Sequence, residues 1–123
     1  MDNLNFIASI PGAGTVFTQA SQAFASSLAI DTSVADIITV ILTGSVTSMT
    51  LNYGGSSTIP TGQRFWLRFV QNATGGWTVV FPPNLHFDQN FAVDPGANRI
   101  TILPMRYNGA NWEFFEEPFS LPG

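Results

Sequence analysis

The chain contains no cysteine and no lysine, and only 10% of its 123 residues are charged. Without cysteine, the protein has no disulfide framework, no thiolate zinc site and no cysteine nucleophile. The four basic residues are all arginine and the net charge is −4. This balance argues against nucleic acid as a partner, because phosphate binding normally needs a basic patch. The single histidine, His86, excludes a metal site built from several histidines of one chain.

Long apolar segments are also missing. The longest, Ile37–Leu42, is far shorter than the roughly 20 residues of a membrane-spanning helix, so no membrane partner is expected. The N-terminus lacks the positive charge that opens a secretory signal. The absence of cysteine fits an assembly that is made in a reducing cytoplasm and stabilised by association.

The low charge has two explanations. A globular domain usually contains about 25% charged residues, which keep its surface from associating. Here Thr, Ser, Asn and Gly provide most of the polar groups. Either much of the surface lies against other subunits, or the chain is a β-rich protein with a neutral polar exterior.

Most of the sequence alternates between apolar and polar residues or forms short β-branched runs, which is typical of β-strands. Residues 18–29 fit a weak helix or a strand equally well. The expected fold class is all-β: an antiparallel β-sandwich or jelly-roll-like barrel over residues 24–123, preceded by an extended N-terminal arm over residues 1–23. Strands are expected at residues 24–31, 37–43, 46–53, 64–71, 77–81, 99–107 and 112–115.

Glycine and proline indicate how these strands connect. Adjacent glycines at positions 75 and 76 predict a hairpin between residues 64–71 and 77–81, and Asn108-Gly109 predicts a second hairpin. Pro104 has no N–H to donate, so it predicts an edge strand or a bulge. The acidic, proline-flanked tail over residues 116–123 is expected on the surface.

Residues suited to catalysis are few. His86 and Asp88 lie two positions apart and form half of a metal site or an acid–base pair, but a loop histidine bonded to a neighbour explains them as well. Glu113, Glu116 and Glu117 form the only acidic cluster. The prolines around that cluster favour a solvated tail over the rigid carboxylate pair that a glycosidase needs. We therefore expect a protein that is not an enzyme and that uses no cofactor or metal ion.

The strand expected at residues 64–71 carries the most unusual surface. Its apolar side chains at positions 65, 67 and 69 share one face, which is expected in the core. Arg64, Trp66 and Arg68 then lie on the opposite face. Because Trp and Arg are enriched in interface hot spots, these three residues are predicted to form a subunit interface. In the alternative interpretation both faces are internal, and acids such as Glu113 neutralise the two arginines.

Several short segments occur in a fixed order: Leu42–Thr47, Gly62–Arg64, Gln71–Val79, Phe81-Pro82 and Tyr107–Trp112. Their order and spacing resemble a β-rich module of tailed-bacteriophage structural proteins, found at the ends of tail or head fibres and in capsid decoration (cement) proteins. The resemblance covers residues 28–115. It implies a non-enzymatic homotrimer that is assembled on the virion.

From this resemblance we expect a capsid decoration protein that binds the major capsid protein on the outer surface of the shell and stabilises it. A fibre tip follows a long shaft, and the residues before the module are too few for one. Phe6, Ile7 and Phe17 of the arm are predicted to dock on the capsid. The alternative is a receptor- or glycan-binding tip module of a phage tail fibre or baseplate. Either protein is made in the host cytoplasm and belongs to the virion.

Overall fold

The computed structural model describes residues 18–86 and 91–122. These residues form nine β-strands and no helix, so the expected all-β class is confirmed. The strands are β1 (Gln19–Gln22), β2 (Ser27–Asp31), β3 (Ile37–Leu42), β4 (Ser48–Asn52), β5 (Arg64–Gln71), β6 (Leu85–His86), β7 (Ile100–Tyr107), β8 (Trp112–Phe114) and β9 (Phe119–Leu121). Nor does this part of the chain hold a helix with the length and hydrophobicity that a membrane span requires.

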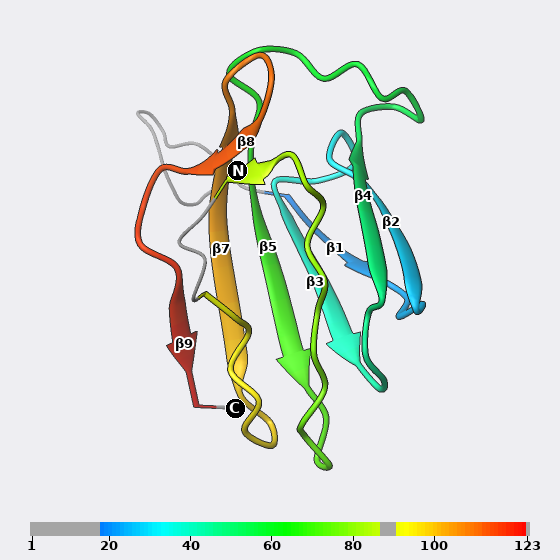
Figure 1. Cartoon of the computed structure of the whole chain (residues 1–123), viewed down its shortest axis with the longest axis vertical. Helices are drawn as coiled ribbons and strands as arrows, with labels where there is room; N and C mark the ends of the chain where they lie inside the picture. Colours follow the sequence, from blue (N-terminus) through cyan, green and yellow to red (C-terminus); the bar gives the residue numbers. More distant parts are fainter. Residues whose placement is uncertain (1–17, 87–90, 123) are drawn as a thin grey trace, which may run out of the picture.

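The strands are divided between two sheets (Figure 1). The large sheet has the order β1-β3-β5-β7-β8-β6, and β9 also pairs with β7. The small sheet contains β2 and β4. The chain therefore alternates between the two sheets from β1 to β5. Each time it returns to a sheet, the new strand pairs with the strand that the chain formed there before.

Pairing is parallel in the first half of the chain and mostly antiparallel in the second. β1 pairs with β3, β3 with β5, and β2 with β4, all in parallel. Because a parallel pair needs a crossover connection, the strand in the opposite sheet supplies it. Antiparallel pairing, which is predicted for the whole fold, joins β7 to β5, β8 and β9. The result is a sandwich-like fold with mixed sheets.

The core lies between the two sheets and is built from alternate residues of each strand. Every second side chain of β5 from Phe65 to Gln71 is buried, and β3 and β4 show the same alternation. Burying one large apolar side chain contributes about 1.5–3 kcal/mol to stability. The largest fully buried side chains come from both sheets and include Trp112, Phe65, Phe69, Leu28 and Ile30. One face of the large sheet is thereby committed to the core.

The predicted hairpin between β5 and residues 77–81 is wrong. Gly75 and Gly76 do have positive φ angles, of 70° and 81°, as a tight turn requires. After them the chain leaves the large sheet, and residues 77–81 contribute only an isolated bridge between Val79 and Val46. β7 lies beside β5 instead and pairs along almost its whole length. The hairpin predicted at Asn108-Gly109 is confirmed, since it joins β7 to β8.

Pro104 does not lie in an edge strand, because β7 has partners on both sides. On one side, β8 pairs with residues 105–107 and β9 with residues 100–102, so Pro104 falls between the two stretches. On the other side Pro104 lies opposite Trp66, whose N–H donates to Asp36 and not to β7. The missing N–H of Pro104 is therefore directed to the gap between β8 and β9, where no strand is paired with it.

Two strands lie in segments that are predicted to be an arm and a tail. β1 falls within the residues expected as an arm, and it forms the edge strand beside β3. β1 and β2 also occupy most of residues 18–29, so the helix alternative is not adopted there. β9 falls within the tail, whose expected exposure is confirmed for its three residues, although they pair with β7.

Candidate functional site

The large sheet has one face against the core and one face directed away from it, which we call the outer face. Outward-pointing residues of β3, β5, β7 and β9 form the outer face. Paired residues of neighbouring strands point to the same side of a sheet, so the strand register defines rows across it. A row at one end pairs Arg64 with Arg106, which in turn lies opposite Glu113 of β8, and three further rows follow it. The first of these three contains Ile37, Trp66 and Pro104; the second contains Thr39, Arg68, Ile102 and Phe119; the third contains Ile41, Val70, Ile100 and Leu121.

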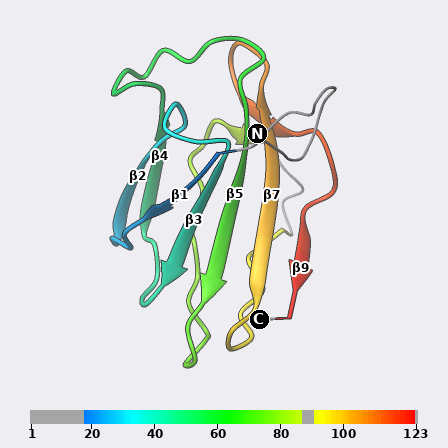
Figure 2. The same ribbon diagram turned by 180° about the vertical axis from the view of Figure 1, so that it is seen from behind.

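Apolar side chains dominate the outer face. Of the five large apolar side chains that are exposed among the described residues, three belong to it: Ile41 is 55% exposed, Phe119 43% and Leu121 40%. Figure 2 looks onto this face, where β5 and β7 lie side by side with no other described strand in front of them. A contiguous exposed apolar patch usually marks a contact surface, so we take the outer face as the candidate site.

Trp66 and Arg64 share an aromatic partner, Phe115. The rings of Trp66 and Phe115 meet edge-on with their centres 5.6 Å apart, and the guanidinium carbon of Arg64 lies 5.2 Å from the centre of the Phe115 ring. Both arrangements are attractive because the face of an aromatic ring carries partial negative charge. Phe115 therefore helps to orient both side chains at one end of the outer face.

Arg68 lies in an open groove of about 500 Å³ in the middle of the outer face. The other residues that line this groove are Gln19, Ile37, Trp66, Ile102 and Phe119. The guanidinium of Arg68 makes one long hydrogen bond within the described residues, 3.5 Å to Thr39 Oγ1. The groove thus combines apolar walls with a positive charge at its centre.

Arg99 and Arg106 have acidic partners. Arg99 Nε lies 3.0 Å from Asp94 Oδ2, and Arg106 Nη2 lies 3.0 Å from Glu113 Oε1. The hydrogen bond from Arg106 is the main reason that the pKa of Glu113 lies below its ordinary value. Glu113 is therefore not the acid that neutralises Arg64 or Arg68, contrary to the alternative drawn from the sequence. Among the described residues, Arg64 and Arg68 have no carboxylate partner.

The structure places the three predicted interface residues together on the outer face, and their role as a subunit interface stays a prediction. The residues predicted for capsid docking, Phe6, Ile7 and Phe17, lie outside the described residues. His86 is exposed in β6, and Asp88, its suggested catalytic partner, also lies outside the described residues. Within residues 18–86 and 91–122, no three histidine or acidic side chains are grouped so that they could hold a metal ion.

A second hollow adjoins the outer face, and we call it the aromatic pocket. Its volume is about 360 Å³, and it is lined by Phe91, Phe114, Phe115, Glu116, Glu117 and Pro118. The rings of Phe91 and Phe114 meet edge-on at 5.6 Å. Because Phe115 also contacts Trp66 and Arg64, the aromatic pocket lies next to the end of the outer face that carries them. The predicted acidic cluster is thereby divided, since Glu113 pairs within the sheet while the two later glutamates line this pocket.

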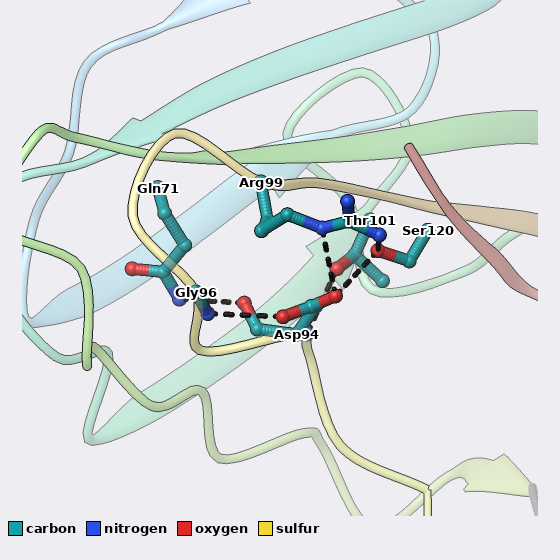
Figure 3. A network of polar contacts seen from close by, with 6 residues as sticks. All are labelled: Gln71, Asp94, Gly96, Arg99, Thr101 and Ser120. Carbon is teal, nitrogen blue, oxygen red and sulfur yellow. Dashed lines mark hydrogen bonds and ion pairs between the residues drawn. The ribbon is translucent and has the colours of Figure 1, made fainter. Parts of the chain in front are cut away.

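β9 contributes two side chains to the outer face and is held through Ser120 by Asp94 (Figure 3). Ser120 Oγ donates to Asp94 Oδ2 at 2.6 Å, and Arg99 Nε donates to the same oxygen at 3.0 Å. The N–H of Gly96 donates to the other carboxylate oxygen at 2.9 Å. The bond from Ser120, followed by that from Gly96, holds the pKa of Asp94 below its ordinary value. Because side chains alternate along a strand, holding Ser120 on the inner side directs its two apolar neighbours to the outer face.

Replacing Ser120 by alanine is expected to loosen β9 without unfolding the core. The reason is that the variant loses the shortest hydrogen bond to Asp94. The pKa of Asp94 is lower in the folded than in the unfolded chain, so its contribution to stability is present above about pH 4 and is lost as the pH falls through the folded value. Protection of the β9 amides against hydrogen exchange, taken relative to the intrinsic exchange rate at the same pH, should therefore be lower in Ser120→Ala than in the wild type at neutral pH. In the wild type this protection should decrease as the pH falls into the acid range.

Ser33→Ala is the matched control for this exchange measurement. Ser33 Oγ donates to Asp31 at 2.6 Å, as short as the bond from Ser120. Asp31 is the last residue of β2, so this bond lies at the end of the small sheet and not at β9. The control should leave exchange of the β9 amides unchanged. Equal exchange of β9 in Ser120→Ala and the wild type would contradict the anchoring role of Asp94.

Sequence reasoning misses the part of the outer face that β9 supplies. Phe119 and Leu121 are separated by one polar residue, which is the alternation expected of a strand. The signal is short and lies between Pro118 and Pro122, so the composition of the segment favours a tail. Backbone pairing with β7 outweighs that local tendency.

Comparison with known proteins identifies a family for this chain. Residues 25–112 match the model of a family described as "Putative phage tail fibre C-terminal domain". The matched range runs from just before β2 to the first residue of β8, so it contains the three central strands of the outer face. Comparison with curated proteins and with solved structures gives no match. Because the family model covers well over half of the sequence, this chain belongs to the phage tail fibre C-terminal domain family and is a structural component of a phage.

Proposed function

We propose that this chain is the tip module of a phage tail fibre, a non-enzymatic domain that recognises the host surface. The observation that carries the proposal is the family match over residues 25–112. Binding surfaces of this kind need a rigid scaffold, and the continuous core between the two sheets provides one. The module contributes contact surface to the virion and needs no cofactor for that task.

The exposed side of the small sheet suits recognition of a neutral polar ligand such as a saccharide. Ser27 and Ser48 lie side by side there, with their hydroxyl oxygens 3.0 Å apart, and Thr50 is exposed two residues further along β4. Hydroxyl groups both donate and accept hydrogen bonds, which matches the hydroxyl-rich surface of a glycan. This side of the molecule is separate from the outer face of the large sheet.

Capsid decoration, the first expectation from the sequence, has less support than the tail fibre. The family description names a tail fibre domain and not a capsid protein. The side chains predicted to dock on a capsid lie outside the described residues. We therefore prefer the tail fibre alternative.

We also propose that the module functions as a homotrimer whose subunits meet at the outer face. Association would remove exposed apolar side chains such as Ile41 and Phe119 from water, which is favourable in proportion to the apolar area covered. The same association explains why the chain has so few charges.

Labelling of purified virions tests the location. An antibody raised against this chain, detected with gold particles in the electron microscope, should bind to the tail fibres. Label confined to the surface of the head would overturn the proposal and support capsid decoration.

Competition for adsorption tests host recognition in the same phage. Purified protein added to host cells before the phage should reduce adsorption in a dose-dependent way. Cells of a strain that the phage does not adsorb to serve as the control, and they should not retain the protein. Undiminished adsorption at saturating protein would reject host recognition by this module.

A further inference from the structure

We infer that the outer face of one copy of the chain binds the aromatic pocket of the next copy, with Arg64 and Arg68 paired to Glu116 and Glu117 of the neighbour. This inference rests on the proposed function, in which several identical chains form the fibre tip. It goes further by naming the two surfaces that meet and the charges that hold them in register.

The first step is the distribution of charge partners. Arg99 and Arg106 are neutralised within the chain. Among the acidic groups, Asp31 accepts hydrogen bonds from Ser33 and Gly54, and Asp36 accepts two from Thr18. Within the described residues, the arginines without an ion pair are therefore Arg64 and Arg68. The carboxylates that accept neither an ion pair nor a hydrogen bond there are those of Glu116 and Glu117. All four belong to the outer face or the aromatic pocket.

The second step is the apolar surface around Arg68. A partner that covers the exposed side chains of Ile41, Phe119 and Leu121 also covers the groove that holds Arg68. A charge that is removed from water without a counter-charge is strongly unfavourable. The partner must therefore bring a carboxylate to the groove, and a second copy of this chain offers two of them at the edge of an aromatic surface.

The third step is symmetry. β5 lies between β3 and β7, and Arg68 occupies an inner row of the outer face. Two outer faces that are packed against each other about a two-fold axis through the middle of the face would place Arg68 opposite Arg68, which is repulsive. A contact between two different surfaces avoids this repulsion, and repeated around an axis it closes into a ring. The homotrimer expected for this module is a ring of this kind.

The test is the mass of the full-length protein in solution, measured by analytical ultracentrifugation over a range of concentrations. The wild type should sediment as a species of three times the 13.3 kDa chain mass. Arg68→Glu should raise the dissociation constant on the order of a hundredfold, because it places like charges at a covered contact. Glu116→Arg combined with Glu117→Arg should have a similar effect.

Charge exchange separates the proposed pairing from simple damage to the fold. The variant that carries Arg68→Glu together with Glu116→Arg and Glu117→Arg should recover most of the lost association. Thr50→Glu is the control, since it adds a negative charge to the exposed side of the small sheet and should leave the trimer intact. Circular dichroism of each variant checks that the strands are retained.

Three outcomes would overturn the inference. The first is a dimer in the wild type, which would indicate a two-fold contact, and the second is a lack of recovery in the charge-exchange variant. The third is a monomeric wild type, and association of that monomer once residues 1–17 are deleted would assign the outer face to that segment. None of these results affects the virion labelling, so the tail fibre proposal can stand when this inference fails.

Discussion

Replacing Trp112 by alanine is expected to lower the free energy of unfolding by about 3–5 kcal/mol, the usual cost of removing a large buried aromatic side chain. Trp112 of β8 is fully buried. Its ring meets Phe65 of β5 edge-on at 5.1 Å and lies 5.2 Å from the ring of Tyr107 in β7. The side chain therefore holds together three strands of the large sheet. Urea denaturation should show a lower midpoint with an unchanged slope.

Two further variants identify the origin of this loss. The indole Nε1 of Trp112 is buried without a hydrogen-bond partner among the described residues, which is unfavourable. Trp112→Phe removes that group and keeps an aromatic ring, so it should cost much less than alanine. Trp66→Ala is the matched control on the outer face, where the side chain is only half-buried. Compared with Trp112→Ala, Trp66→Ala should lower the stability of the monomer less and weaken the association of subunits more.

Equal losses of monomer stability in Trp112→Ala and Trp66→Ala would contradict the different roles given to the two tryptophans. The comparison has to be made at a concentration where both variants are monomeric. Otherwise dissociation of an assembly would contribute to the unfolding free energy.

Alternation along single strands is the part of the fold that the sequence predicts best. The pattern of β5 places Phe65 in the core and Trp66 on the opposite side, and both are found there. This works because side-chain direction depends only on position within a strand. Strand pairing depends on distant segments instead, so the parallel crossovers between the two sheets have no local signal.

In the candidate site, too, the alternation within one strand is predictable from the sequence and the pairing between strands is not. Trp66 and its two flanking arginines follow from the pattern of β5, but the apolar rows on either side of them need the register with β3, β7 and β9. The hairpin at Asn108-Gly109 does fix one further pair, since it places Arg106 opposite Glu113. The ion pair between these two residues therefore follows from the hairpin register alone. The side chains that β9 adds to the outer face depend on its pairing with β7, which the composition of this segment does not indicate.

The two adjacent glycines after β5 show how a local signal can be right about conformation and wrong about topology. Both have positive φ angles, yet the chain does not turn back along β5. Hydrogen bonds from Gln71 explain the actual path. Its side-chain Nε2 donates to the carbonyl oxygens of Trp77 and Asp94 at 2.8 and 3.1 Å, and its Oε1 accepts the N–H of Trp77 at 3.3 Å. Gln71 is almost fully buried and so ties the two loops to the end of β5.

Gly75→Ala is expected to destabilise the protein by clearly more than Gly76→Ala, although the two glycines share a similar backbone conformation. An L-residue at positive φ costs roughly 1–2 kcal/mol, and this is the whole expected effect at Gly76, where an added Cβ meets nothing within 4 Å. At Gly75 the same Cβ would lie 2.8 Å from the backbone nitrogen of Ala97 and 2.9 Å from the carbonyl oxygen of Pro95. Backbone atoms cannot rotate away, so the loop must shift.

The shift has a consequence for the outer face, because residues 95–97 follow Asp94 directly. Displacing them should weaken the hydrogen bonds that the Asp94 carboxylate accepts from Gly96 and Ser120. β9 would then be held less firmly against β7. Gly75→Ala should therefore lower the urea midpoint by the larger amount and also increase hydrogen exchange of the β9 amides, whereas Gly76→Ala should change only the midpoint. Similar midpoints and similar β9 exchange in the two variants would show that the close approach of Gly75 to this loop does not support the outer face.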